Sequence, residues 1–478
     1  MTGALAALHQ PRPPAHPREI VASGLCIGCG ACTALAQASA ASARMDWNAD
    51  GHLEPVTPQP WLEDGAFAQV CPFSPVAADE TTIAAERFAQ APHGDALIGR
   101  YAGAYVGHVD EGEFRMGGSS GGMVSWVAAE LLRRGLVHGV AHVTPRSRGE
   151  GDGRLFGYRI SRSLEDLQEG AKSRYYPVEM SGILREIAEV EGRYAVVGIP
   201  CFIKAVNLLR RQDPVFAKRV THTIGLFCGH MKSARMVDSF ALQLGTEPES
   251  VAAIDYRLKN PDRPANWYTA QLTLTDGTTR QQDWWHLVDG DWGSGFFMNA
   301  ACNFCDDVVA ETADIAMGDA WVEPYSSDGK GTNVVIARSP LMLELVEQGI
   351  AEGRLQLSQV DHAFVSQTQA AGFRQRREGL AYRLAQRRSH PLGPVQPVKR
   401  VSPSRAIPSR RKLIYRMRQT ISRNSHRAFR LARALHWPAL YIRWGRAALA
   451  AYHGLAYSRG RLGRVVDRLI DPKAAARD

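Results

Sequence analysis

Cys26-Ile27-Gly28-Cys29-Gly30-Ala31-Cys32 places three cysteines within seven residues, and Cys71, followed by a proline, comes after 38 intervening residues. Three thiolates at this spacing can bind three irons of a 4Fe-4S cubane, and the glycines permit a tight backbone whose amides face the cluster sulfurs. Ala36 stands where a bacterial ferredoxin carries its next cysteine, so we expect one cluster here. The alternatives are structural zinc, which usually takes two separated C-x2-C pairs, and a disulfide.

The other four cysteines are dispersed along the chain, at Cys201, Cys228, Cys302 and Cys305. Two of them follow short apolar stretches, residues 194–199 and 223–227, that we predict to be buried strands. Open α/β sheets gather their ligands at the carboxyl edge of the strands, so we expect these thiols to meet there. On the residues alone, a second cluster, a zinc ion and separate inert thiols all remain open.

The composition is that of a globular protein, with 45% hydrophobic and 22% charged residues in a chain of 478. This length indicates two or three domains. No run of about 18 uncharged apolar residues occurs, and the proline-rich start lacks the apolar core of a secretory signal. We therefore expect a cytoplasmic protein rather than an integral membrane protein. In the cytoplasm cysteines are more often metal or cluster ligands than partners in disulfides.

Charge is divided unevenly along the chain. Residues 399–478 contain 20 Lys and Arg against three Asp, a net charge of +17, which leaves residues 1–398 with a net charge of −8. Apolar and aromatic residues recur at helical spacing within this basic extension. It is therefore expected to be helical, and either to rest on anionic lipid, to contact nucleic acid or to pack on the body.

The pattern of helices and strands predicts an α/β fold with a mixed sheet. Residues 121–134 have one apolar face and end at a glycine, which is typical of a helix, and a buried strand is expected to follow at 137–143. Alternation over residues 268–274 leads into Asp276-Gly277, which predicts an antiparallel hairpin. Further elements are expected as strands at 333–337 and helices at 202–211 and 233–244.

We divide the chain into five parts by texture and composition. They are a loose Pro- and His-rich arm at 1–19, a small ferredoxin-like 4Fe-4S domain at 20–80, two α/β regions at 100–190 and 191–390, and the basic helical extension at 395–478.

Seven ordered motifs resemble the beta subunits of coenzyme F420-reducing hydrogenases and dehydrogenases, a family similar to 7-hydroxymethyl chlorophyll a reductase and ferredoxin-dependent divinyl chlorophyllide reductase. The resemblance spans about residues 25–338. It rests on the first cysteine motif with Cys71, and on Gly118-Ser119-Ser120-Gly121-Gly122, Lys172-Ser173-Arg174-Tyr175, Gly198-Ile199-Pro200-Cys201, Phe227-Cys228-Gly229, Tyr256-Arg257-Leu258-Lys259, and the Cys302/Cys305 pair followed by residues 313–321.

The resemblance implies a flavoenzyme. Such a protein holds FAD beside two 4Fe-4S clusters, one for each cysteine quartet, and receives electrons from ferredoxin or an electron-donating subunit. A cluster carries one electron at a time, whereas a flavin converts between one- and two-electron chemistry and can pass a hydride to a small-molecule substrate. The region at 100–190 is then the family's FAD-binding region, and 191–390 contains the second cluster.

The residues expected to hold FAD lie in three of these motifs. A glycine-rich loop before a helix offers free backbone amides and a positive helix end to a pyrophosphate or to the flavin. The expected contacts are Ser119, Ser120, Gly121, Gly122, Lys172, Ser173, Tyr175, Arg257 and Lys259. A flexible connection and ordinary surface charges are the alternatives. His230, which follows Cys228, is a candidate proton donor or else a packing residue.

Two other functions compete with a reductase. The chain can be an electron-transfer subunit that reduces a deazaflavin with a separate partner, or a zinc-stabilised protein that binds nucleic acid or membrane through its extension. We also expect a homo-oligomer, located in the cytoplasm and peripherally on the inner membrane surface if the extension contacts lipid.

Overall fold

An eight-stranded mixed sheet lies at the centre of the computed structural model, which describes residues 14–35, 43–56, 66–146, 153–391, 393–460 and 463–465. In sheet order the strands are β15 (Leu355–Gln359), β5 (Gly103–Val109), β14 (Asn333–Ala337), β13 (Ile315–Asp319), β9 (Val220–Leu226), β8 (Tyr194–Gly198), β6 (Gly139–Pro145) and β7 (Phe156–Ser161).

The four central strands, β13, β9, β8 and β6, run parallel, and the strands on both sides of them are antiparallel. This confirms the predicted mixed sheet. The carboxyl ends of the parallel strands lie along one edge, and β8 and β9 each lead directly into a cysteine-bearing segment. The sheet therefore places Cys201 and Cys228 on neighbouring strand ends.

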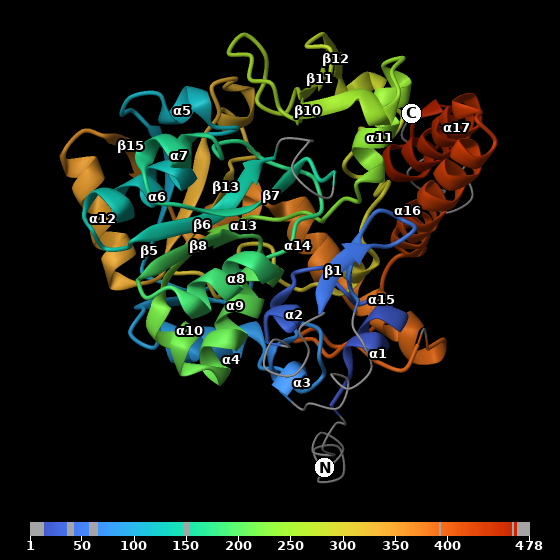
Figure 1. Ribbon diagram of the computed structural model, residues 1–478. Helices are drawn as coiled ribbons and strands as arrows, with labels where there is room; N and C mark the ends of the chain where they lie inside the picture. The colour runs from blue at the N-terminus through green and yellow to red at the C-terminus, as the bar shows by residue number, and fades with distance from the viewer. Residues whose placement is uncertain are drawn as a thin grey trace.

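Helices cover both faces of the sheet (Figure 1). On one face α6 (Met123–Arg133) and α12 (Pro340–Ala351) bury apolar residues against the strands. On the other face α8 (Ser181–Glu189), α9 (Pro200–Gln212) and α10 (Pro214–Arg219) do the same. Strands buried on both faces read as continuous apolar runs, which is the pattern of β8 and β14.

The first cysteine quartet lies in a small N-terminal unit that packs against α8 and α9. This unit contains α1 (Pro17–Ala22), α2 (Ala31–Leu35), the two-stranded sheet of β1 (Arg44–Trp47) and β2 (Leu53–Val56), and α3 (Ala66–Val70). The predicted arm at 1–19 falls largely outside the described residues, and its last three residues belong to α1. The ferredoxin-like character of 20–80 stays a prediction.

A second small sheet lies beyond the carboxyl edge of the central one (Figure 1). It contains β10 (Val251–Asp255), β11 (Thr269–Leu274) and β12 (Thr279–Asp283), and β11 and β12 form the hairpin that the sequence predicts around Asp276-Gly277. The other elements are β3 (His93–Asp95), β4 (Gly99–Tyr101), α4 (Glu80–Arg87), α5 (Phe114–Gly117), α7 (Leu164–Gln168), α11 (Arg235–Gln243), α13 (His362–Thr368), α14 (Ala370–Arg376) and α15 (Glu378–Ser389).

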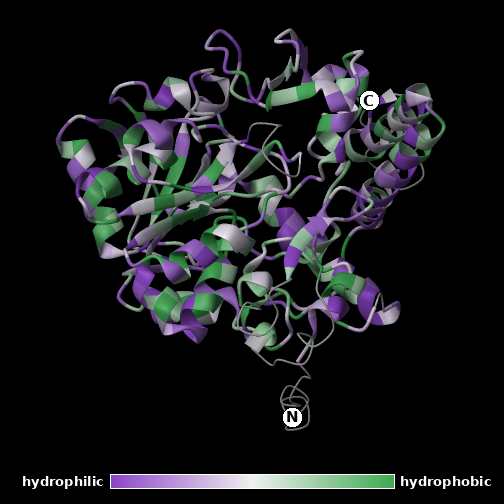
Figure 2. Ribbon diagram, viewed as in Figure 1, coloured by the Kyte–Doolittle hydropathy of each residue, from purple (hydrophilic) through white to green (hydrophobic). Residues whose placement is uncertain are grey.

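Two long helices, α16 (Ser409–Ala434) and α17 (Pro438–Tyr457), form a hairpin in the basic extension. They lie side by side at one end of the molecule, with hydrophilic and hydrophobic residues interspersed along both (Figures 1 and 2). Buried residues such as Ile421, Phe429 and Tyr441 join the apolar core that also contains α11 and β10–β11. The extension is thus helical and packs on the body. In the described part of the chain, none of the helices combines the length and the apolar character needed to cross a membrane.

Candidate functional site

The first cysteine quartet is built by two short segments. Cys26, Cys29 and Cys32 lie on the loop that enters α2 and in its first turn, and Cys71 follows α3. Burial raises the pKa of Cys32 well above its usual value, and the charges of Cys29, Cys26 and Cys71 add to this. All four thiols therefore lie near one another in a dry environment, with no disulfide among them.

Backbone geometry at this quartet depends on glycine. Gly30 has φ of +78°, and a Cβ at this position would lie 2.5 Å from the Glu179 carboxylate and 2.9 Å from the Ser181 amide nitrogen. Only glycine adopts this conformation and leaves room for the close approach of α8. The amide of Gly28 donates to the sulfur of Cys26 at 3.4 Å, the type of N–H···S contact that supports a cluster ligand.

The second cysteine quartet comes together from distant parts of the chain. Cys201 lies in the first turn of α9, three residues after the end of β8, and Cys228 follows β9. Cys302 and Cys305 lie in and just after a 3₁₀ turn at Ala300–Phe304. All four line one small cavity, together with Ile27 and Phe73 of the N-terminal unit. Burial, followed by the charges of Cys305, Cys228 and Cys302, raises the pKa of Cys201.

The two quartets are neighbours. The charge of Cys29 contributes to the raised pKa of Cys201. Burial, together with the charges of Cys201 and Cys29, raises the pKa of the Tyr158 phenol. Tyr158 donates a hydrogen bond to the Val197 carbonyl at the end of β8. The two quartets therefore lie next to each other where the N-terminal unit packs against the sheet edge.

Four sulfurs around one cavity are the donor set of a 4Fe-4S cluster. Among the described residues, no group of three or more His, Cys, Asp or Glu is arranged as ligands of a single metal ion. The amide of Met231 also donates to the sulfur of Cys302 at 3.3 Å. The donor chemistry and the N–H···S contacts fit a cluster at each quartet.

One cation lies directly against the second quartet. Arg376, at the end of α14, is 3% exposed and lines the same small cavity as the four cysteines. Its guanidinium donates to the carbonyls of Cys302, Cys228 and Gly229 at 3.1, 3.0 and 2.7 Å. Although burial opposes its charge, the cysteine sulfurs raise the pKa of Arg376 above its usual range. A fixed positive charge thus faces the four sulfurs.

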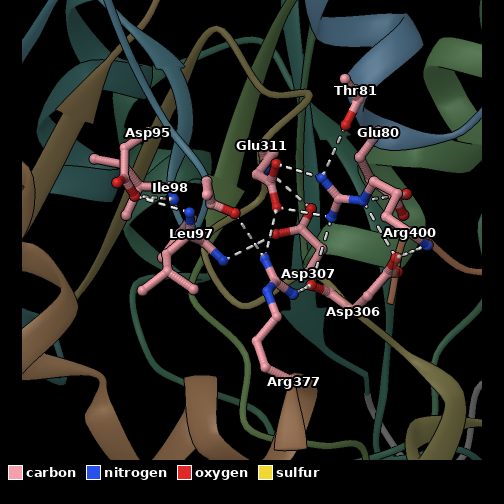
Figure 3. Close-up of polar contacts among 12 residues, drawn as sticks. Glu80, Thr81, Asp95, Leu97, Ile98, Asp306, Asp307, Glu311, Arg377 and Arg400 are labelled. Carbon is pink, nitrogen blue, oxygen red and sulfur yellow. Dashed lines mark hydrogen bonds and ion pairs between the residues drawn. The ribbon is translucent and has the colours of Figure 1, made fainter. Parts of the chain in front are cut away.

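A buried ion network follows Cys305 in the chain (Figure 3), and Asp307 of this network also lines the small cavity. Arg400 lies between Asp306, Glu311 and Glu80, and contacts Glu311 at 2.6 Å and Asp306 at 3.2 Å. Burial and the neighbouring Glu311 raise the pKa of Asp307 to about 7. Because buried charges need partners, this network fixes the Cys305 segment against residues that follow α15.

A larger cavity of about 280 Å³ opens on the other side of Cys228, which lines both cavities. Its walls come from the glycine-rich loop before α6, residues 170–178, the ends of β8, β9 and β13, and residues 228–232. Of the expected flavin contacts, Ser119, Ser120, Gly122, Lys172, Ser173, Tyr175 and Arg257 line it. Its position at the carboxyl ends of parallel strands is where open α/β sheets bind ligands.

The glycine-rich loop is fixed to the sheet edge. Gly122, with φ of +87°, is the N-cap of α6, and the Ser119 hydroxyl accepts a hydrogen bond from the amide of Ser173 at 2.9 Å. Gly121 does not line the cavity, because it packs against β14, where an added Cβ would lie 2.8 Å from the Asn333 side chain. Gly121 therefore allows the close approach, while its neighbours face the cavity.

Arg257 and Lys259, two cations that we expected to contact the flavin, differ in where their side chains lie. Arg257 lines the cavity, pairs with Asp319 at 3.0 Å and stacks over Tyr268. Lys259 is not among the lining residues, since its ammonium donates to the carbonyls of Arg115, Ser120 and Lys330. These bonds give Lys259 a supporting role for the glycine-rich loop, and its contact with a cofactor stays a prediction.

His230 lines the cavity and stacks on Trp292, with ring centroids 4.3 Å apart. Burial and the charges of Lys232, Arg418 and Arg376 lower the pKa of His230 well below its usual value, so the imidazole is neutral at pH 7. Its buried Nε2 atom has no hydrogen-bond partner among the described residues. This ring nitrogen is free to meet a ligand in the cavity.

Sequence motifs missed four residues of this site: Tyr158, Lys232, Trp292 and Arg376. Lys232 follows His230 by two residues, and its ammonium donates to the Phe296 carbonyl and lies 4.9 Å from the Trp292 ring centroid. The position of Lys232 two residues after His230 in the sequence could have identified it as a candidate site residue. Trp292 and Arg376 carry no motif, and only the fold brings them to the cavities.

Comparison with known families matches two adjoining segments. Both belong to the family described as "Coenzyme F420 hydrogenase/dehydrogenase, beta subunit": its N-terminal part matches residues 104–185, and its C-terminal part matches residues 191–363. Together they cover more than half of the chain. The C-terminal hairpin and Arg376 lie beyond both.

A chain of the F420-reducing [NiFe] hydrogenase complex from Methanosarcina barkeri is similar to this one at 16% identity. The similarity covers 64% of this chain and 99% of that chain, with a TM-score of 0.48. Among curated proteins, no sequence matches.

Proposed function

This chain belongs to the coenzyme F420 hydrogenase/dehydrogenase beta-subunit family, a family of oxidoreductase subunits, and from this we propose that it is an iron–sulfur flavoprotein reductase. In this proposal each cysteine quartet holds a 4Fe-4S cluster, and the large cavity holds FAD. Electrons enter from ferredoxin or a partner subunit, and a small-molecule substrate accepts them.

The observation that carries the proposal is the contiguity of three sites. Cys29 lies near Cys201, and Cys228 lines both the small cavity of the second quartet and the large cavity. Clusters carry single electrons and a flavin pairs them, so these cofactors function together only when they are close. The order along the path is then the first quartet, the second quartet and the large cavity.

Residues that line the large cavity supply the contacts proposed for FAD. Backbone amides at the start of α6 and the cation of Lys172 suit a pyrophosphate, because a helix start carries partial positive charge. Tyr175 and Trp292, whose ring centroids are 4.9 Å apart, offer flat apolar surface to a ring system. Asp319 keeps Arg257 fixed at the cavity wall.

A proton must accompany the electrons that reach the substrate. His230 lines the cavity, and its buried Nε2 atom has no partner within the described structure, so this atom can relay a proton to a bound molecule. Lys232, whose pKa burial lowers to about 7, lies beside the same ring system and can replenish that proton. These two residues are the proposed proton route.

Anaerobic purification followed by metal and flavin analysis tests the proposal. Two cubanes require roughly eight irons per chain, and FAD should be released on denaturation. Cys29→Ser and Cys302→Ser should each reduce the iron content by about half, since each variant removes a ligand from a different quartet. Stoichiometric zinc without iron or flavin would refute the proposal and favour a zinc-stabilised binding protein.

The family descriptions favour a second candidate, an electron-transfer subunit that reduces a deazaflavin together with a catalytic partner. The cofactors proposed above are the same in both cases. Turnover of the isolated chain with reduced ferredoxin and a deazaflavin acceptor separates them, because an electron-transfer subunit that depends on its catalytic partner shows none alone.

A further inference from the structure

Residues 289–298 bring Trp292 to the wall of the large cavity and have almost no regular secondary structure. Trp292 of this segment faces the cavity and stacks on His230, and the carbonyl of Phe296 accepts a hydrogen bond from Lys232. The segment contains three glycines, at 290, 293 and 295. Such a backbone has high conformational entropy, so contacts from outside must fix it.

Gln243 of α11 supplies one of those contacts, to Asp289, and the amide of Ser233 supplies another, to the Phe297 carbonyl. The C-terminal hairpin supplies a further set. Each of its two helices donates or accepts hydrogen bonds along the length of the segment. The pairs are Tyr441 with Asp289 at 3.0 Å, His453 with Asp291 at 2.7 Å, Arg418 with the Gly293 carbonyl, Ser425 with the Phe297 amide at 2.9 Å, and Ser422 with the Met298 carbonyl at 2.9 Å.

Aromatic packing joins the same two parts. Phe297 lies against Phe429 of α16 and Tyr441 of α17, with ring centroids 5.6 Å away in each case. Phe296 meets Trp444 of α17 at 5.7 Å. Both phenylalanines are fully buried, so the hairpin removes them from water.

We propose that the C-terminal hairpin is a working part of the ligand site: it holds residues 289–298 so that Trp292 and His230 present a fixed stacked surface to the molecule in the large cavity. This goes beyond the family match, which ends at residue 363. The identity of that molecule as FAD rests on the proposed function. The residues on the hairpin act through Trp292 and are positioning residues.

A pair of double variants of the full-length chain tests this inference. Arg418→Met with His453→Phe removes two polar contacts to the segment while keeping most of the side-chain volume. Arg423→Met with Arg427→Met is the matched control, since both residues are exposed on α16 and have no ion pair or hydrogen bond in the described structure. Thermal unfolding establishes that both variants are folded.

Three measurements are made on each protein. Hydrogen exchange should be faster at residues 289–298 in the first variant only, because these amides lose their support. FAD affinity, followed by quenching of flavin fluorescence, should fall about tenfold, equivalent to about 1.4 kcal/mol, and the visible circular dichroism of bound flavin should change. The control should match the wild type in all three.

The outcomes separate this inference from the proposed function. If the first variant and the control show the same exchange and the same flavin spectrum, the hairpin does not position the wall and the inference is overturned. If exchange rises as expected but the wild-type chain binds no FAD, the wall is supported and the flavin assignment of the proposed function fails.

Discussion

Replacing Arg376 with Gln should make the second cluster harder to reduce. The guanidinium donates to the Cys228 and Cys302 carbonyls and lines the small cavity. A cluster bound there would have its centre on the order of 7 Å from this charge. At an effective dielectric constant of about 20, a unit charge at that distance stabilises one added electron by about 2.4 kcal/mol. With 59 mV per tenfold change in a one-electron couple, the potential should fall by about 100 mV.

The assay is a redox titration followed by electron paramagnetic resonance of the reduced clusters. Arg376→Lys keeps the charge and should stay near the wild-type potential. Arg383→Gln is the matched control: Arg383 is buried and donates to the Asn303 carbonyl, yet no cysteine contributes to its pKa shift. Both Gln variants leave carbonyls unpaired and should lose stability, at about 1–3 kcal/mol for each buried group.

An unchanged potential in Arg376→Gln would refute the electrostatic reasoning. An equal shift in Arg383→Gln would do so as well, because it would assign the effect to loosened packing rather than to charge.

Three further predictions concern the loop, the buried lysine and the extension. Gly121→Ala should destabilise the chain by about 1–3 kcal/mol in thermal unfolding, since its Cβ meets backbone of β5 and β14, whereas Gly117→Ala meets nothing within 4 Å and should be neutral. Burial lowers the pKa of Lys232 to about 7, so the unfolded chain binds more protons than the folded chain between pH 7 and about 10.5. This residue therefore makes the free energy of unfolding rise with pH over that window. In denaturant titrations Lys232→Met should reduce the rise, and an identical slope in the variant would contradict the assignment. The full chain should float with anionic vesicles, and Arg423→Glu with Arg427→Glu should weaken this; equal flotation of both proteins would remove the predicted lipid contact.

Local sequence patterns predicted much of the fold. The strand expected at 333–337 is β14 with the same bounds, and the helix expected at 121–134 is α6, enclosed by Gly122 and Gly135. The strand expected at 223–227 begins three residues earlier, because Val220 and His222 pair with β8 although the polar His222 interrupts the apolar run. Pairing across the sheet therefore extended a strand that periodicity alone shortened.

The site could be predicted only where its residues belong to a recognisable sequence motif. The second cysteine quartet meets where strand ends were expected to bring it, since Cys201 and Cys228 follow adjacent parallel strands. Arg376 and Trp292 could not be found in this way. Each reaches its place through contacts between segments more than sixty residues apart, and no local pattern records such contacts.

Arg376 and the helical hairpin also bear on what the smallest working piece of this protein is. A polypeptide cut at residue 363 would retain all eight sulfurs and every recognisable signature, yet the carbonyls of Cys228 and Cys302 would lose their donor, and Phe296 and Phe297 would face solvent. The part of the chain that the family shares therefore ends before the part that the site needs. A fragment of this protein should include Arg376 and the C-terminal hairpin.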